Sequence, residues 1–89
     1  MSKDTLIAEA ILGRDVEEFL NTELGEYLMQ RADAEIAEAS EKLSTVAPWR
    51  RRKIQELQNQ VWRAGSLKTW LAELIIAGRQ SLSIMDDEE

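Results

Sequence analysis

The chain has 89 residues, of which 44% are hydrophobic and 31% are charged, and its formal net charge is -6. This hydrophobic content is typical of a folded chain, and a chain of this length forms one small domain. Cysteine and histidine are absent, which excludes disulfides, thiolate metal sites and the commonest general base. Only four glycines and one proline occur among residues that favour helices, so the composition predicts an all-α fold.

The charge is divided unevenly along the chain. Residues 1–49 hold eleven acidic and four basic residues, whereas residues 50–85 hold two acidic and seven basic residues. An acidic half and a basic half in one small chain should attract each other when the chain folds. The last four residues, 86–89, are all acidic, and we expect them to form a frayed tail after a single helical domain of residues 1–85.

The N-terminal residues predict one or two short helices. Leu6, Ala10 and their apolar neighbours fall on one face of a helix. Gly13 is a typical stop for such a helix at its C-terminal end. Asp15 and Glu18 then resemble a capping box, which would begin a second, short helix.

A longer helix is predicted for residues 22–45. Apolar and small residues recur there every three or four positions, at Leu24, Leu28, Ala32, Ile36, Ala39, Leu43 and Val46. Pro48 disfavours a helical conformation in the residue before it and suits the first turn of a new helix. We therefore expect a tight turn near residues 45–48 and a second long helix over residues 48–83.

The last helix carries a heptad-like pattern from Ile54 to Met85, in which Lys68 is the one basic intrusion. The phase of this pattern continues through Gly65-Ser66, although an interior glycine costs about 1 kcal/mol relative to alanine. This continuity favours one helix; a kink, with Ser66 capping a separate helix, is the alternative. The two long helices should form a helical hairpin, with the N-terminal helices packed over its open end.

A second apolar stripe on the last helix predicts an interface. Trp62, Leu67, Trp70 and Leu74 lie off the seam that would pack on the preceding helix. A helix that is apolar on two sides must bury its second side against the N-terminal helices or against another subunit. We therefore predict that these four residues, together with Tyr27, form an interface in a homo-oligomer.

Four consecutive basic residues follow Trp49, namely Arg50, Arg51, Arg52 and Lys53. On a helix they spread around almost the whole circumference, whereas a helix that reads a nucleic-acid groove would gather them on one face. Beside the expected turn they lie near Glu38, Glu41 and the negative end of the preceding helix. We interpret Trp49 and the basic run as a clasp that closes the hairpin. The alternatives are a site for an acidic protein partner and a grip on phosphates, with the indole of Trp49 stacked on a base.

No pattern in the sequence indicates catalysis, a metal site or a cofactor. The acidic residues between positions 33 and 41 lack the histidines of di-metal bundle sites and the spacing of a calcium loop. The glycines are isolated, so there is no phosphate loop, and the serines have no histidine to activate them. No apolar run approaches the roughly 20 residues that span a bilayer. We expect an intracellular, non-enzymatic protein with no membrane segment and no small-molecule substrate.

One resemblance covers most of residues 19 to 78. It rests on Phe19-Leu20, Glu23-Leu24-Gly25-Glu26-Tyr27-Leu28, Arg31-Ala32, Leu57-Gln58-Asn59-Gln60-Val61-Trp62-Arg63-Ala64 and Trp70-Leu71. These segments resemble a group of small helical proteins that are encoded by tailed bacteriophages and prophages. The resemblance implies an accessory protein of a kind that commonly has no assigned function, and it carries over no active site.

The expected function is helix-mediated protein–protein association. We expect the chain to associate with itself or with another phage or host protein, in the cytoplasm of the bacterial host or on the virion. The alternative is a small nucleic-acid-associated protein that uses Trp49 and the run Arg50–Lys53, although the overall acidity argues against nucleic acid as the main ligand. A third interpretation, an inhibitor that mimics DNA with its acidic face, is less favoured because the net charge is modest.

Overall fold

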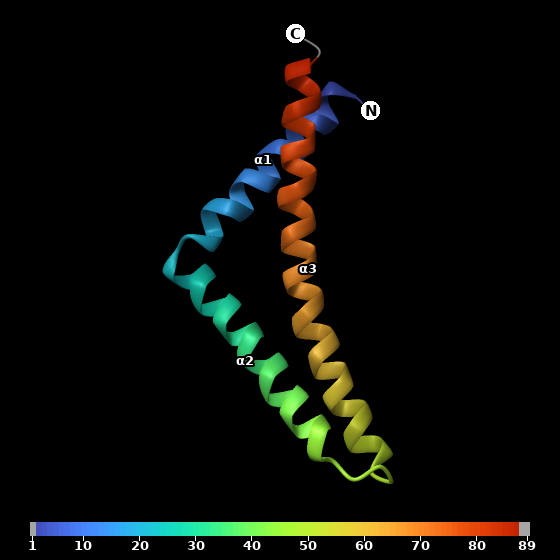
Figure 1. Ribbon diagram of the computed structural model, residues 1–89. Helices are drawn as coiled ribbons and strands as arrows, with labels where there is room; N and C mark the ends of the chain where they lie inside the picture. Colours follow the sequence, from blue (N-terminus) through green and yellow to red (C-terminus); the bar gives the residue numbers. More distant parts are fainter. Residues whose placement is uncertain (1, 88–89) are drawn as a thin grey trace.

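The computed structural model describes residues 2–87, which form three α-helices and no strand (Figure 1). α1 spans Lys3–Leu20, α2 spans Glu23–Thr45 and α3 spans Arg51–Asp87. The all-α class predicted from the composition is confirmed. Figure 1 shows that α1 and α2 meet at a corner and run to opposite ends of α3, so that the three helices trace a triangle.

α1 is one continuous helix, so the predicted stop at Gly13 is wrong. The helix begins after Ser2, whose side chain accepts a hydrogen bond from the Thr5 N–H, and Asp15 lies in its interior instead of capping a second helix. A glycine that ends a helix usually adopts a positive φ, which no glycine of this chain does. Gly13 is buried against α3, where a Cβ atom would lie 2.7 Å from the Leu74 carbonyl oxygen. It therefore permits a close approach between two helices.

The corner between α1 and α2 depends on Thr22 and Gly25. The Thr22 hydroxyl donates a hydrogen bond to the Phe19 carbonyl oxygen at 2.6 Å and accepts one from the Gly25 N–H at 3.0 Å. A Cβ atom at position 25 would overlap the same carbonyl oxygen, so a larger residue does not fit. The chain can therefore turn a sharp corner here. Of the three helix pairs, α1 and α2 have the smallest contact with each other.

The connection between α2 and α3 is a turn with Pro48 at its second position. The Arg50 N–H donates a hydrogen bond to the Ala47 carbonyl oxygen at 3.0 Å, which closes a four-residue turn in which proline is favoured at that place. α3 therefore begins at Arg51, three residues later than predicted. From this connection α2 and α3 diverge towards the corner (Figure 1).

α3 is a single helix that passes through Gly65-Ser66, so the alternative of two helices with a kink is wrong. It also extends beyond the predicted end at residue 83, to Asp87. Asp86 and Asp87, which we expected in a frayed tail, are helical. The rest of that predicted tail, residues 88–89, lies outside the described residues.

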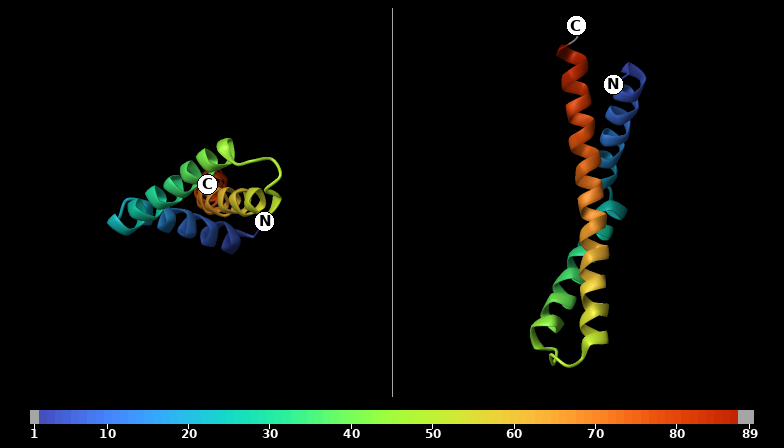
Figure 2. Two further views of the ribbon diagram at one scale, coloured as in Figure 1. Left: turned by 90° about the horizontal axis from the view of Figure 1, so that it is seen from below. Right: turned by 90° about the vertical axis from the view of Figure 1, so that its right-hand side faces the viewer.

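The buried core of the described residues is small and rich in alanine. Seven apolar residues are buried, four of them alanines: Leu6, Ala10, Val16, Ala32, Ala39, Leu57 and Ala64. The chain measures 60 × 29 × 15 Å, and its radius of gyration is 18.0 Å, against about 12 Å for a compact chain of this length. Figure 2 shows the reason for this extended shape. α1 lies along one half of α3 and α2 lies along the other half, so no third layer of helix covers the described residues.

Candidate association surface on the long helix

α1 crosses α3 at a contact between two glycines. A Cβ atom on Gly78 would lie 3.0 Å from the Gly13 Cα and 3.0 Å from the Glu9 carbonyl oxygen. Ala10 and Ser81, one turn away on either helix, are also small and buried. The helix backbones therefore touch directly, and α1 covers one side of α3 at this crossing.

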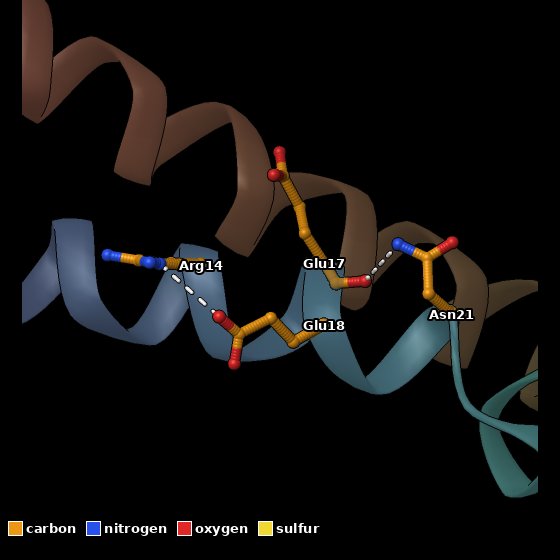
Figure 3. Close-up of polar contacts among 4 residues, drawn as sticks. All are labelled: Arg14, Glu17, Glu18 and Asn21. Carbon is orange, nitrogen blue, oxygen red and sulfur yellow. Dashed lines mark hydrogen bonds and ion pairs between the residues drawn. The ribbon is translucent and has the colours of Figure 1, made fainter.

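Polar side chains lock the same crossing. The Ser81 hydroxyl, only 2% exposed, donates a hydrogen bond to the Glu9 carboxylate at 2.6 Å. Arg79 pairs with Glu17 at 2.7 Å. Figure 3 shows Glu17 pointing towards α3, while Arg14 and Glu18 of α1 pair with each other at 3.3 Å. The polar groups at this crossing are thus bound within the chain, and the crossing is a structural contact.

α2 packs on the N-terminal half of α3 through Ala32, Ala39, Leu57 and Ala64, which are all buried. Lys68, the basic intrusion in the apolar stripe of α3, forms an ion pair with Asp33 of α2. The side-chain amide of Gln60 donates a hydrogen bond to the backbone carbonyl of residue 35 at 3.2 Å. Through these contacts α2 covers a second side of α3.

The side of α3 that faces away from α1 and α2 is uncovered. Trp62 and Trp70 are 68% and 60% exposed, and they border a shallow groove of about 350 Å³. The floor and walls of this groove also include Val61, Gly65, Ser66, Thr69 and Glu73, all on α3. Exposed indoles next to small residues on one helix are typical of a surface that another chain covers.

The five residues predicted as an interface do not form one surface. Leu67 borders a hollow between α2 and α3 that Leu28 and Ala32 also line. Leu74 is half-buried at the crossing with α1, where its carbonyl oxygen approaches Gly13. Only Trp62 and Trp70 border the uncovered groove. The pattern placed four of these residues on one stripe, but α1 and α2 approach α3 from directions that divide the stripe.

Tyr27, the fifth predicted interface residue, lies exposed on α2. A hydrogen bond with the Tyr27 side chain, followed by the Glu35 carboxylate, raises the pKa of the Arg31 guanidinium above its ordinary value. Arg31 and Glu35 also form an ion pair at 3.4 Å. Tyr27 therefore belongs to a local polar cluster on α2, away from the groove between Trp62 and Trp70.

Two exposed residues of α3 were missed by the sequence argument, Ile76 and Ile84. Ile76 is 55% exposed and follows Thr69 by seven residues, which puts it on the same side of the helix. Its helical phase was the available signal. The interface was predicted from the tryptophans, and their face was not extended towards the end of the helix.

The predicted clasp does not form as ion pairs. Among residues 2–87, no ion pair involves Arg50, Arg51, Arg52 or Lys53. Glu38, an expected partner, instead pairs with Lys42 of its own helix at 2.8 Å, and this pairing lowers the pKa of Glu38. Lys42 also lines a hollow together with Arg50 and Lys53, so the basic run meets another cation there. Trp49 is 81% exposed beside this basic end.

The described residues show no group of three acidic residues that could hold a metal ion. No helix in that part of the chain is long and apolar enough to cross a membrane. Comparison of the chain with protein-family models, with curated proteins and with solved structures finds no match.

Proposed function

We propose that this chain is a non-enzymatic helical protein that works by association with other protein chains, first with copies of itself. The incomplete core is the observation that carries the proposal. Only seven apolar residues are buried, whereas thirteen large hydrophobic residues of the described chain are exposed. In this proposal the arrangement of α2 and α3 as a hairpin, with α1 over its open end, is a scaffold that presents α3.

The accessible surface supports association as well. It amounts to 6863 Å², whereas a compact monomer of this mass exposes about 5300 Å². The difference of about 1500 Å² exceeds the roughly 800 Å² that each partner buries in a standard interface. One chain therefore has enough surplus surface for at least one partner.

Sedimentation at micromolar concentration tests the proposal directly. We expect the wild type to associate, and we expect the double variant Trp62→Ala/Trp70→Ala to raise the dissociation constant at least tenfold, because buried tryptophans dominate interface energies. Trp49→Ala is the matched control, since it removes an exposed indole that lies outside the groove. A wild type that remains monomeric at about 100 μM, where even weak dimers form, would reject the proposal.

We also propose, on the resemblance of residues 19 to 78, that the chain is an accessory protein of a bacteriophage or prophage. In this role it would bind a further phage or host protein in the host cytoplasm or on the virion. A pull-down from infected or lysogenic cells tests this. A partner that binds the self-associated form should be retained by the wild type and by Trp49→Ala, and lost with Trp62→Ala/Trp70→Ala, which dissociates that form. Equal capture by all three proteins would contradict a role for the groove.

The basic end between α2 and α3 favours a second candidate function, association with a nucleic acid. Trp49 and the run Arg50–Lys53 surround a shallow hollow of about 390 Å³, together with Glu56. Unpaired cations beside an exposed indole can bind phosphates and stack on a base. The formal net charge of -6 opposes this function.

Anisotropy titrations with labelled single-stranded DNA and RNA at low salt decide the second candidate. The triple variant Arg50→Ala/Arg51→Ala/Arg52→Ala should lose binding if the basic end is the site. Arg14→Ala/Arg31→Ala/Arg63→Ala is the matched control, because it removes the same charge elsewhere. If the wild type does not bind, or if both triple variants weaken binding equally, the basic end is not a nucleic-acid site.

A further inference from the structure

We propose that two copies of this chain pair antiparallel along the uncovered side of α3, with the two-fold axis at Thr69. This inference rests on the proposed self-association and specifies its geometry. In this arrangement a second copy of the chain fills the groove beside Trp62 and Trp70. The support comes from the charges at the two ends of α3, from the register of the residues between them, and from the surplus surface of the chain.

The outer face of α3 is defined by positions that recur every three or four residues and average 3.6, the period of an α-helix. It consists of Arg51, Gln55, Gln58, Trp62, Ser66, Thr69, Glu73, Ile76, Gln80, Ile84 and Asp87. All are exposed except Ser66, which is intermediate. The buried residues of α3, which contact α1 and α2, lie on its other sides: Leu57, Ala64, Gly78 and Ser81.

The charges on the outer face select the direction of pairing. Arg51 stands at one end and Asp87 at the other, and Glu73 is the one further charge between them. The other charged residues of α3 lie off this face. A parallel pair would place like charges together at both ends. An antiparallel pair places Arg51 of each copy beside Asp87 of the other, so opposite charges attract at both ends of the pair.

The register of the outer face is nearly matched when it is reversed about Thr69. Trp62 then lies opposite Ile76, and these two residues are 68% and 55% exposed in the single chain. Gln58 lies opposite Gln80, so that two side-chain amides can exchange hydrogen bonds.

The remaining outer-face positions complete the reversed order. Ser66 is one residue out of register with Glu73, because reversal about Thr69 places position 72 opposite it, and its hydroxyl can still donate to that carboxylate. The mismatch is between Gln55 and Ile84, which come within one residue of lying opposite each other. Near the axis, Gly65, Ser66 and Thr69 are small, which lets the two helices approach closely. Apart from this mismatch, the groups on this face find suitable partners to within one residue of a single register.

Single-cysteine cross-linking measures this geometry cleanly, because the chain has no cysteine of its own. A Gln58→Cys chain is mixed with a size-tagged Gln80→Cys chain and mildly oxidised. We expect the mixed disulfide to exceed both like-with-like disulfides at least tenfold. Thr69→Cys alone should cross-link with itself, because this position lies on the axis. Ser40→Cys, exposed on α2, is the control that should remain reduced.

Each other outcome contradicts the proposal in a different way. Like-with-like disulfides from Gln58→Cys alone would show a parallel pair. A wild type that sediments as an oligomer while none of the outer-face cysteines cross-links would show association through another surface, and the proposed self-association would survive. A monomeric wild type would remove the self-association itself.

A charge swap tests the ends of the outer face independently. Arg51→Asp should weaken association about fivefold, since two exposed ion pairs are lost per dimer. Arg51→Asp/Asp87→Arg should restore the wild-type dissociation constant, because the swapped charges again face each other. Circular dichroism of each variant shows whether it keeps its helices. Failure of the double swap to restore association in a fully helical protein would overturn the pairing of these ends.

Discussion

The two halves of α3 are held by different kinds of contact. At the crossing with α1, the backbones meet at Gly13 and Gly78, and the buried Ser81 hydroxyl binds Glu9. Along α2, alanine and leucine side chains pack instead, and the ion pair between Lys68 and Asp33 is exposed. The first contact has little tolerance for added atoms, whereas the second uses a common pattern of small and apolar residues. Variants at the crossing should therefore have the larger effects.

The first and largest of these predictions concerns Gly78→Ala, which would push α1 and α3 a few tenths of an ångström apart. The added methyl group would lie 3.0 Å from backbone atoms of Glu9 and Gly13. Backbone atoms cannot change rotamer as a side chain can, so the helices themselves must shift. We expect the free energy of unfolding to fall by about 1–3 kcal/mol in urea titrations.

Gly65→Ala is the matched control for this prediction. A Cβ atom at position 65 meets nothing within 4 Å, and alanine is the better helix former. Both alanines are compared at a protein concentration too low for the chains to pair, and there we expect Gly65→Ala to gain up to about 1 kcal/mol. Equal effects of the two alanines would mean that the helices do not cross at Gly78.

Ser81→Ala should have the next largest effect, because it leaves the Glu9 carboxylate without its hydrogen-bond donor at a part-buried site. We expect a loss of about 1–2 kcal/mol in the free energy of unfolding. Ser83→Ala, two residues further on and exposed, should change stability little. A loss shared equally by both variants would mean that the hydrogen bond to Glu9 is not its cause, and it could not come from helix propensity, because alanine is a better helix former than serine.

Asp33→Asn sharpens the comparison from the α2 side. It removes the ion pair with Lys68, whose side chain is 39% exposed, and keeps the size of the side chain. We expect a loss of no more than about 1 kcal/mol, which high salt should diminish. Glu41→Gln is the control, because Glu41 forms no ion pair among the described residues. A loss as large as that of Ser81→Ala would show that α2 is held as specifically as α1.

The smallest expected effect is the pH dependence of the pair between Glu38 and Lys42. The pair lowers the pKa of Glu38 in the folded chain. Its contribution is therefore present above the unfolded pKa and is lost as the pH falls through the folded pKa. The melting temperatures of wild type and Lys42→Met should differ slightly at pH 7 and converge in acid. A constant difference at all pH values would contradict this account.

The pattern of apolar residues predicted α2 closely, over residues 22–45 against the observed Glu23–Thr45. It also predicted that α3 continues through Gly65, because the heptad-like pattern keeps its phase there and this can be read from the local sequence. The ends of α3 were placed less well: the turn at Pro48 shifts its start to Arg51, and the helix continues past residue 83 to Asp87.

The candidate site was predicted in part. The sequence singled out Trp62 and Trp70, which border the groove, but grouped them with Leu67 and Leu74, which lie beside α2 and α1. A helical stripe shows only that residues share a side of one helix. Which part of that side is covered depends on the directions from which two other helices approach.

Composition and periodicity by themselves determined the all-α class, the long helices and the lack of a recognisable catalytic pattern. The tertiary structure alone decided the role of Gly13. A glycine at that position can end a helix or admit a second helix, and the choice depends on Gly78, which lies 65 residues further along the chain. The same holds for the basic run, because its pairing depends on which carboxylates the fold leaves free near Arg50. Local propensities act within a few residues, whereas close approaches and ion pairs across helices exist only after distant segments have met.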